Sequence, residues 1–143
     1  MLGGSNMRKL VLIALVVGAA LVATACSSGS SLTGKTWQWT AMTTTTPTSQ
    51  SVVPTDQQAN YTIEFKSDGT FASKVDCNQV GGSYTTTASG GLTIVPGPST
   101  LVACPEGSMA SIFLAGLSSA ASYTIADGAL KITTQDASTL TFK

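Results

Sequence analysis

The sequence predicts a small, mainly β domain of the α+β type: a single curled antiparallel sheet, or small barrel, with one amphipathic helix. Two observations support this prediction. Short segments that alternate apolar and polar residues recur at near-regular spacing and are separated by turn sequences, which is typical of antiparallel barrels and sandwiches. One later segment instead repeats apolar residues every three or four positions, which is the helical period.

The composition fits one such domain. The chain has 143 residues, and removal of an N-terminal leader over residues 1–25 leaves about 118, enough for one modest core. Hydrophobic residues make up 43% of the chain and charged residues 10%, a balance too apolar for a disordered protein. The many threonines and valines favour strands.

Charge and residue types exclude several functions. Arg8 and Lys9 lie in the leader, so the remaining chain carries five bases against seven acids. A net charge of about −2 argues against a nucleic-acid partner, which requires a basic surface. The chain contains no histidine, the usual general base and the commonest metal ligand. We therefore expect a non-enzymatic protein without metal or cofactor.

The N-terminus has the organisation of a secretory signal peptide. Positively charged Arg8 and Lys9 precede an uncharged apolar run over residues 10–22, and small residues at 23–25 lead directly to Cys26. The apolar run is shorter than the roughly 20 residues that a spanning helix needs. We therefore expect a cleaved leader rather than a transmembrane helix.

The residues around Cys26 resemble the lipobox of bacterial lipoproteins, although Ala23 stands where leucine is more usual. The resemblance implies a signal peptide at 1–25, lipid modification of Cys26, a short tether at 26–31 and a folded domain at 32–143. Two or more acyl chains on one cysteine would hold the protein stably, extracytoplasmic and anchored to the cell membrane. The alternative is a secreted protein cleaved near Ala25.

The domain begins with a predicted strand over residues 32–42. Trp37 and Trp39 alternate there with polar residues, which indicates one buried aromatic face. Residues 43–60 form a low-complexity polar stretch interrupted by Pro47 and Pro54, which we interpret as a surface loop.

Three hairpins and a closing strand are predicted next, because paired alternating segments flank turn residues such as Gly69, which tolerates the positive φ of a tight turn. The predicted pairs are residues 61–65 with 71–75, 83–87 with 92–95, and 123–125 with 130–132, followed by a last strand at 139–142.

Residues 105–121 interrupt the strand pattern and predict the helix. Pro105 suits the first helical position, and Glu106 in the first turn favours the helix dipole. The polar face of this helix lacks Lys and Arg, so we expect the apolar face to pack on the sheet rather than lie on a membrane surface. That face consists of Met109, Ile112, Phe113, Leu117 and Ala120.

Several short motifs are spread over residues 32–143: Leu32-x-Gly34-x-x-Trp37, Cys77-Asn78-x-x-x-Gly82-x-Tyr84, Thr100-x-x-Ala103-Cys104-Pro105, Ser122-Tyr123-x-Ile125 and Leu140-x-Phe142. Together they resemble the META domain, the family of the heat-shock protein HslJ. The resemblance implies a curled, barrel-like sheet with one helix, in proteins associated with the envelope and with stress tolerance, and it implies no catalytic residues. Asp76 departs from the family's usual glycine, and Leu101-Val102 from its Arg-Met.

Cys77 and Cys104 are the two cysteines that remain after the leader is removed. In an oxidising compartment such a pair most often forms a structural disulfide. Two free buried thiols are a second interpretation. A reactive thiol is a third, but it needs a cationic neighbour, and Lys74 is the one nearby in sequence.

Aromatic residues and one amide are the candidate ligand contacts: Trp37, Trp39, Tyr61, Tyr84 and Asn78. For the tryptophans we favour core packing, and for Asn78 a turn over a polar position inside a cavity. We expect a lipid-anchored envelope protein that binds an envelope protein or lipid, or has a structural, stress-protective role. The alternative is a thiol-dependent redox protein or enzyme.

Overall fold

The computed structural model describes residues 31–100 and 102–143; the predicted signal peptide and Cys26 lie outside them. Within this part no helix is long and apolar enough to cross a membrane. The elements, in chain order, are β1 (Thr36–Thr45), β2 (Thr48–Val52), the short 3-10 helix η1 (Gln58–Asn60), β3 (Tyr61–Phe65), β4 (Thr70–Val75), β5 (Asn78–Thr86), β6 (Leu92–Ser99), α1 (Ala110–Ser118), β7 (Ala120–Ala126), β8 (Ala129–Thr134) and β9 (Thr139–Phe142).

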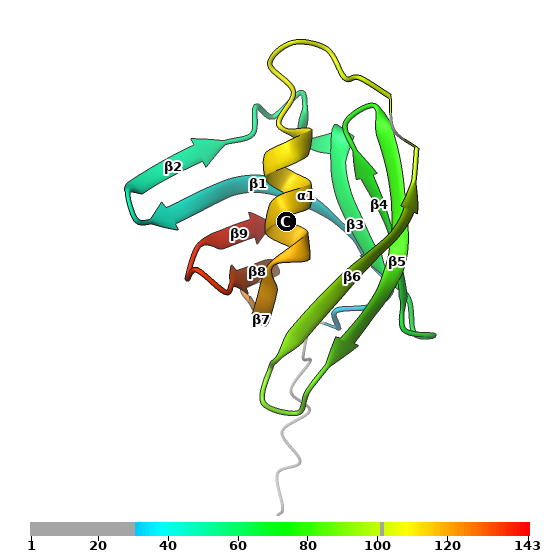
Figure 1. The fold of residues 1–143 in the computed structure, drawn as a ribbon. Helices are drawn as coiled ribbons and strands as arrows, with labels where there is room; N and C mark the ends of the chain where they lie inside the picture. The colour runs from blue at the N-terminus through cyan, green and yellow to red at the C-terminus, as the bar shows by residue number, and fades with distance from the viewer. Residues whose placement is uncertain (1–30, 101) are drawn as a thin grey trace, which may run out of the picture.

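The strands form one curled antiparallel sheet in the order β6-β5-β4-β3-β1-β9-β8-β7, and β2 pairs with β1 outside this path (Figure 1). The curl brings the two ends of the sheet together at one point. There Gly91 and Ser122 form an isolated bridge, and the Tyr123 N–H donates to the Gly90 carbonyl at 2.9 Å. The predicted fold class is thus confirmed.

The core fills the inside of the curl, and α1 lies across its opening (Figure 1). Trp37 and Trp39 are both fully buried, as the alternation predicted. Phe113 and Leu117 of α1 are fully buried against the sheet, with the Phe113 ring stacked on Trp39 at 4.9 Å between centroids. The helix therefore closes the core. Phe113 and Leu117 pack on the sheet as predicted, but Ile112 of the predicted apolar face is 45% exposed and Ala120 belongs to β7.

The three predicted hairpins are present. The first pairs Phe65 with Phe71, the second is β5–β6 and the third β7–β8, and β9 completes the sheet beside β8 and β1. Pro96 and Pro98 lie on β6, at one edge of the sheet. Proline lacks an N–H and is confined to such edges or to bulges.

The prediction of a surface loop over residues 43–60 was wrong. β1 continues to Thr45 and pairs with β2, so that Thr45 faces Thr48 and the intervening Thr46-Pro47 forms the turn. The segment is rich in β-branched threonine, which suits an extended backbone, but it is polar on both faces and gives no alternation. The hairpin extends beyond the rest of the sheet in Figure 1.

The predicted helix at 105–121 was too long. The observed helix begins at Ala110 and ends at Ser118, and strand β7 follows at once. Gly107 has φ +85°, a conformation outside the right-handed helix, so Pro105 and Glu106 cannot belong to its first turn. The helix start is fixed instead by Tyr61, whose hydroxyl accepts from the Met109 N–H at 2.9 Å.

Candidate functional site

Cys77 and Cys104 are joined in a disulfide, with their Cα atoms 5.5 Å apart. Cys77 lies in the tight turn between β4 and β5, where the preceding Asp76 adopts φ +57°. Asp76 thus takes the left-handed conformation that glycine adopts more easily. The disulfide ties this turn to the segment that leads into α1.

Asn78 clamps the same segment. Its Oδ1 accepts from the Val102 N–H at 2.8 Å and from the Thr100 hydroxyl at 3.3 Å, and its Nδ2 donates to the Val102 carbonyl at 3.0 Å. The Nδ2 also lies 3.4 Å from Cys104 Sγ and 3.5 Å from Cys77 Sγ. Asn78 closes the tight turn as the partner of Val75 and is also the first residue of β5. Its amide replaces the backbone bonds that an irregular segment lacks.

The surroundings of the disulfide favour a structural role. The Lys74 ammonium donates to Asn60 Oδ1 at 2.9 Å rather than to either sulfur. No group of three or more His, Cys, Asp or Glu residues gathers as a metal site within residues 31–100 and 102–143. The geometry thus provides a covalent tie and a hydrogen-bonded clamp.

Removing the disulfide should lower the free energy of unfolding. The bond closes a loop with a sequence separation of 27, and the chain-entropy model gives a loss of about 3 kcal/mol for such a loop. Urea unfolding of a Cys77→Ser/Cys104→Ser variant measures this loss. Dithiothreitol should bring the wild type to the variant's midpoint and leave the variant unchanged. A loss below about 1 kcal/mol would mean that the Asn78 hydrogen bonds already hold the loop.

Three of the four candidate aromatic contacts lie in the core. Trp37 and Trp39 are fully buried and Tyr61 is 1% exposed. The Trp37 indole donates to the Leu32 carbonyl at 3.0 Å and the Trp39 indole to the Ala41 carbonyl at 2.8 Å. The two indole N–H groups are therefore satisfied within the fold, and neither tryptophan presents a surface to a ligand.

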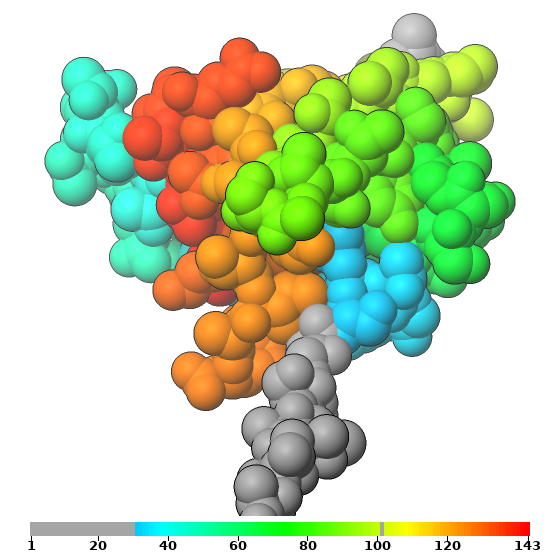
Figure 2. All heavy atoms as spheres, turned by 90° about the horizontal axis from the view of Figure 1, so that it is seen from below, coloured from blue at the N-terminus to red at the C-terminus, as the bar shows by residue number. Residues whose placement is uncertain are grey.

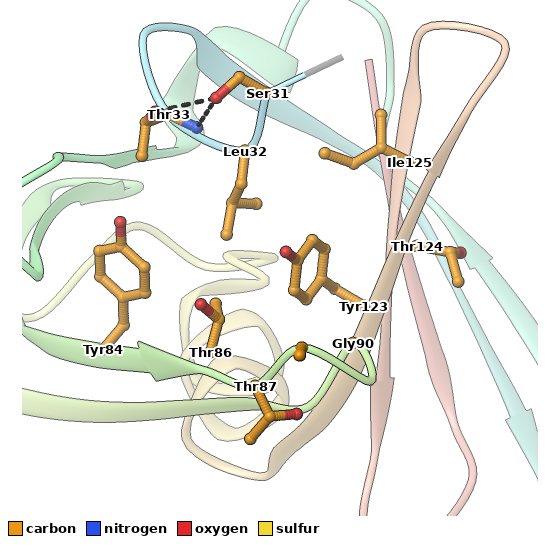
Figure 3. A pocket seen from close by; sticks show the side chains of 11 residues that line it. Ser31, Leu32, Thr33, Tyr84, Thr86, Thr87, Gly90, Tyr123, Thr124 and Ile125 are labelled. Carbon is orange, nitrogen blue, oxygen red and sulfur yellow. Dashed lines mark hydrogen bonds between the residues drawn. The ribbon is translucent and has the colours of Figure 1, made fainter. Parts of the chain in front are cut away.

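Tyr84, the fourth, lines a cavity of about 540 Å³. This hollow, which we call the seam cavity, lies where the two ends of the sheet meet, between the β5–β6 turn, strand β7 and the segment 31–33 (Figure 3). Seen from below in Figure 2, the start of the described chain lies beside β7 and the β5–β6 turn. The lining residues include Leu32, Tyr84, Thr86, Tyr123 and Ile125.

The chain positions these side chains through long-range contacts. The Trp37 bond to Leu32 holds the N-terminal segment against β1, and a parallel bridge between Thr33 and Phe65 holds it against β3. Tyr84 packs edge-on against Phe65 with centroids 4.8 Å apart. Its hydroxyl donates to the Lys66 carbonyl at 2.7 Å, so the ring has a fixed orientation.

The pKa of the Tyr84 phenol, which lines the seam cavity, is raised above its usual value. Burial raises the pKa of Tyr84, and the negative charges of Asp68 and an ionised Tyr123 would raise it further, so the phenol keeps its proton at neutral pH. Hydrogen bonds from Thr70 lower the pKa of Asp68, and bonds from the Thr134 hydroxyl and the Ser138 N–H lower that of Asp136. Both carboxylates act as acceptors within turns.

The other cavity residues could not be recognised from the sequence. Tyr123 and Thr86 come from different hairpins, and Leu32 precedes the first strand. Each fits an ordinary strand or strand-end position, and only the closure of the sheet brings them together.

A curled sheet closed by one helix and tied by one disulfide defines the chain as a small β domain. The family model described as "META domain" matches residues 30–143, so the chain belongs to the META-domain family. No curated protein matches this chain.

Two solved structures are similar in fold. A DUF4847 family protein from Bacteroides vulgatus has a TM-score of 0.59 at 16% identity, over 78% of this chain and 92% of the other. A protein from Burkholderia xenovorans has a TM-score of 0.62 at 22% identity, over 78% of this chain and 82% of the other. At these identities the likeness concerns the fold alone.

Proposed function

We propose that this META-domain protein is a lipid-anchored binding protein of the cell envelope, extracytoplasmic and non-enzymatic, with a role in envelope stress tolerance. The single observation that carries the proposal is the lipobox-like sequence ending at Cys26, placed five residues before Ser31. Ser31 and Leu32 belong to the lining of the seam cavity, so the candidate anchor and the candidate binding site are neighbours along the chain.

The length of the tether limits how far the cavity can lie from the membrane. An extended chain spans at most about 3.6 Å per residue, so five residues reach about 18 Å. An acylated Cys26 would therefore hold the N-terminal end of the folded domain close to the membrane surface. The seam cavity would lie on the membrane-proximal side, within reach of a lipid headgroup or a membrane-bound envelope protein.

Binding, rather than catalysis, agrees with the chemistry of the domain. The chain has no histidine, and Asp68 and Asp136 are exposed acceptors in turns. In the part of the chain that the structure describes, no charged residue lines the seam cavity, so no carboxylate or ammonium group is placed there to act as a general acid or base.

Substitution of Cys26 tests the anchor. Metabolic labelling with a palmitate analogue should mark the wild type, and Cys26→Ser should abolish the label and move the protein from the membrane to the soluble fraction, because the acyl chains that hold it are lost. A Cys77→Ser/Cys104→Ser variant is the matched control and should keep the label. Undiminished labelling of Cys26→Ser would exclude the proposed anchor.

A further inference from the structure

The seam cavity is polar but uncharged. Its lining contains no Asp, Glu, Lys or Arg among the described residues. A phosphate or carboxylate ligand would need a cationic partner, and a cationic ligand would need a carboxylate. The cavity volume of about 540 Å³ is within the usual range for small-molecule sites. The lining thus favours a neutral ligand.

The polar groups that the fold leaves available are hydroxyls. The Tyr84 hydroxyl already donates to Lys66 and keeps only acceptor capacity. The Tyr123 and Thr86 hydroxyls line the cavity (Figure 3) and make no hydrogen bond to the described part of the chain. A ligand that both donates and accepts can satisfy all three groups, and a compound with several hydroxyls has this property.

Apolar surfaces lie beside these hydroxyls. The rings of Tyr84 and Tyr123 lie on either side of Leu32, and the Ile125 side chain lies near them (Figure 3). Tyrosine combines a flat apolar ring with a polar tip. A pyranose ring is complementary to this arrangement, because its axial C–H groups form an apolar face and its equatorial hydroxyls form a polar rim.

We propose that the seam cavity binds a neutral pyranose sugar, with its C–H face on the tyrosine rings and its hydroxyls bonded to Tyr123 and Thr86. The source of the sugar rests on the proposed function: an anchor within about 18 Å favours the headgroup of a neutral glycolipid, and a free glycan is the other source. The sugar specificity itself does not depend on the anchor.

Fluorine NMR can test the site with an internal control. The chain has three tyrosines, of which Tyr84 and Tyr123 line the cavity and Tyr61 is buried in the core. The full chain labelled with 3-fluorotyrosine, in phosphatidylcholine nanodiscs, would be titrated with methyl glucoside, methyl galactoside, methyl mannoside and N-acetylglucosamine. The Tyr84 and Tyr123 resonances should shift and saturate in the millimolar range, while Tyr61 should not move. Mannitol, which has hydroxyls but no ring face, should leave all three unchanged.

A matched pair of variants locates the binding. Thr86→Val removes a cavity hydroxyl with little change in shape and should weaken binding by about fivefold, the effect of one lost hydrogen bond. Thr85→Val alters the neighbouring residue, which is exposed and outside the cavity, and should leave the affinity unchanged. The Tyr61 resonance reports in each variant that the core is intact.

The outcomes of these titrations distinguish sugar binding itself from the source of the sugar, a glycolipid headgroup or a free glycan. Shifts in nanodiscs that contain monoglucosyl diacylglycerol, without added sugar and reversed by methyl glucoside, would establish the headgroup. Shifts with free glycosides alone would keep the sugar site and overturn the headgroup. Absence of saturable shifts with all four sugars, or equal effects of mannitol, would overturn the proposal. Loss of the Cys26 anchor would not affect the free-sugar titration, so the two proposals fail separately.

Discussion

Gly82→Ala is expected to lower the free energy of unfolding by more than about 3 kcal/mol, at or beyond the upper end of ordinary overpacking. A methyl group at this position would lie 2.2 Å from the Val95 carbonyl oxygen and 2.9 Å from the Gly97 nitrogen. Both are backbone atoms of β6, so no rotamer change can relieve the overlap. The two strands would have to separate where the ladder between Val80 and Gly82 already changes register.

Gly81→Ala is the matched control. A methyl group there would meet the Phe71 carbonyl oxygen at 3.6 Å, an ordinary van der Waals contact. Urea unfolding should therefore give a midpoint near that of the wild type for Gly81→Ala and a much lower one for Gly82→Ala. Equal midpoints for the two variants would mean that β5 and β6 can separate without loss, which is contrary to their close approach at Gly82.

The position of Gly82 gives the Cys77-Asn78-x-x-x-Gly82-x-Tyr84 motif a physical explanation. One end of the motif ties down the segment before α1 through the disulfide and the Asn78 amide. Its glycine lets β6 approach at an irregularity, and such irregularities bend a strand and increase its twist. The other end places Tyr84 in the seam cavity. The segment 77–84 thus connects the disulfide, the irregularity that curves the sheet and the seam cavity.

Local patterns were sufficient to predict three hairpins and the burial of the tryptophans. The pairing of residues 61–65 with 71–75 depends on a turn glycine and on alternation with period two, both of which can be recognised within about fifteen residues. Trp37 and Trp39 follow the same alternation and lie in the core. These features are predictable because each depends on residues that are close together in the sequence.

A hairpin without alternation, and features that depend on distant contacts, could not be predicted in this way. The β1–β2 hairpin is polar on both faces, so its threonines alternate in no recognisable way, and the start of α1 depends on a bond from Met109 to Tyr61. The seam cavity exists because Gly91 meets Ser122 across the closed curl. Such closure depends on the summed twist of the strands, which no single segment encodes.

Phe113→Ala should destabilise the domain by about 3–5 kcal/mol, the usual cost of truncating a fully buried phenylalanine. Phe113 stacks on Trp39 and meets the Tyr61 and Phe142 rings at 5.7 and 6.1 Å between centroids. Its loss would leave a void at the centre of an aromatic cluster that cannot collapse without moving both the helix and the sheet. A domain of this size has a total stability of about 5–15 kcal/mol, so the variant should lose a large share of its stability.

Ile112→Ala separates this packing effect from helix propensity. Ile112 is the preceding residue of the same helix but is 45% exposed, so its truncation removes little buried surface, and alanine is the better helix former. Its urea midpoint should stay close to that of the wild type, while Phe113→Ala falls far below. If both variants lost stability equally, the burial of Phe113 would not account for the loss, because alanine favours the helix at both positions. The stacked Trp39 contact would then not be what holds α1 in the opening of the curled sheet.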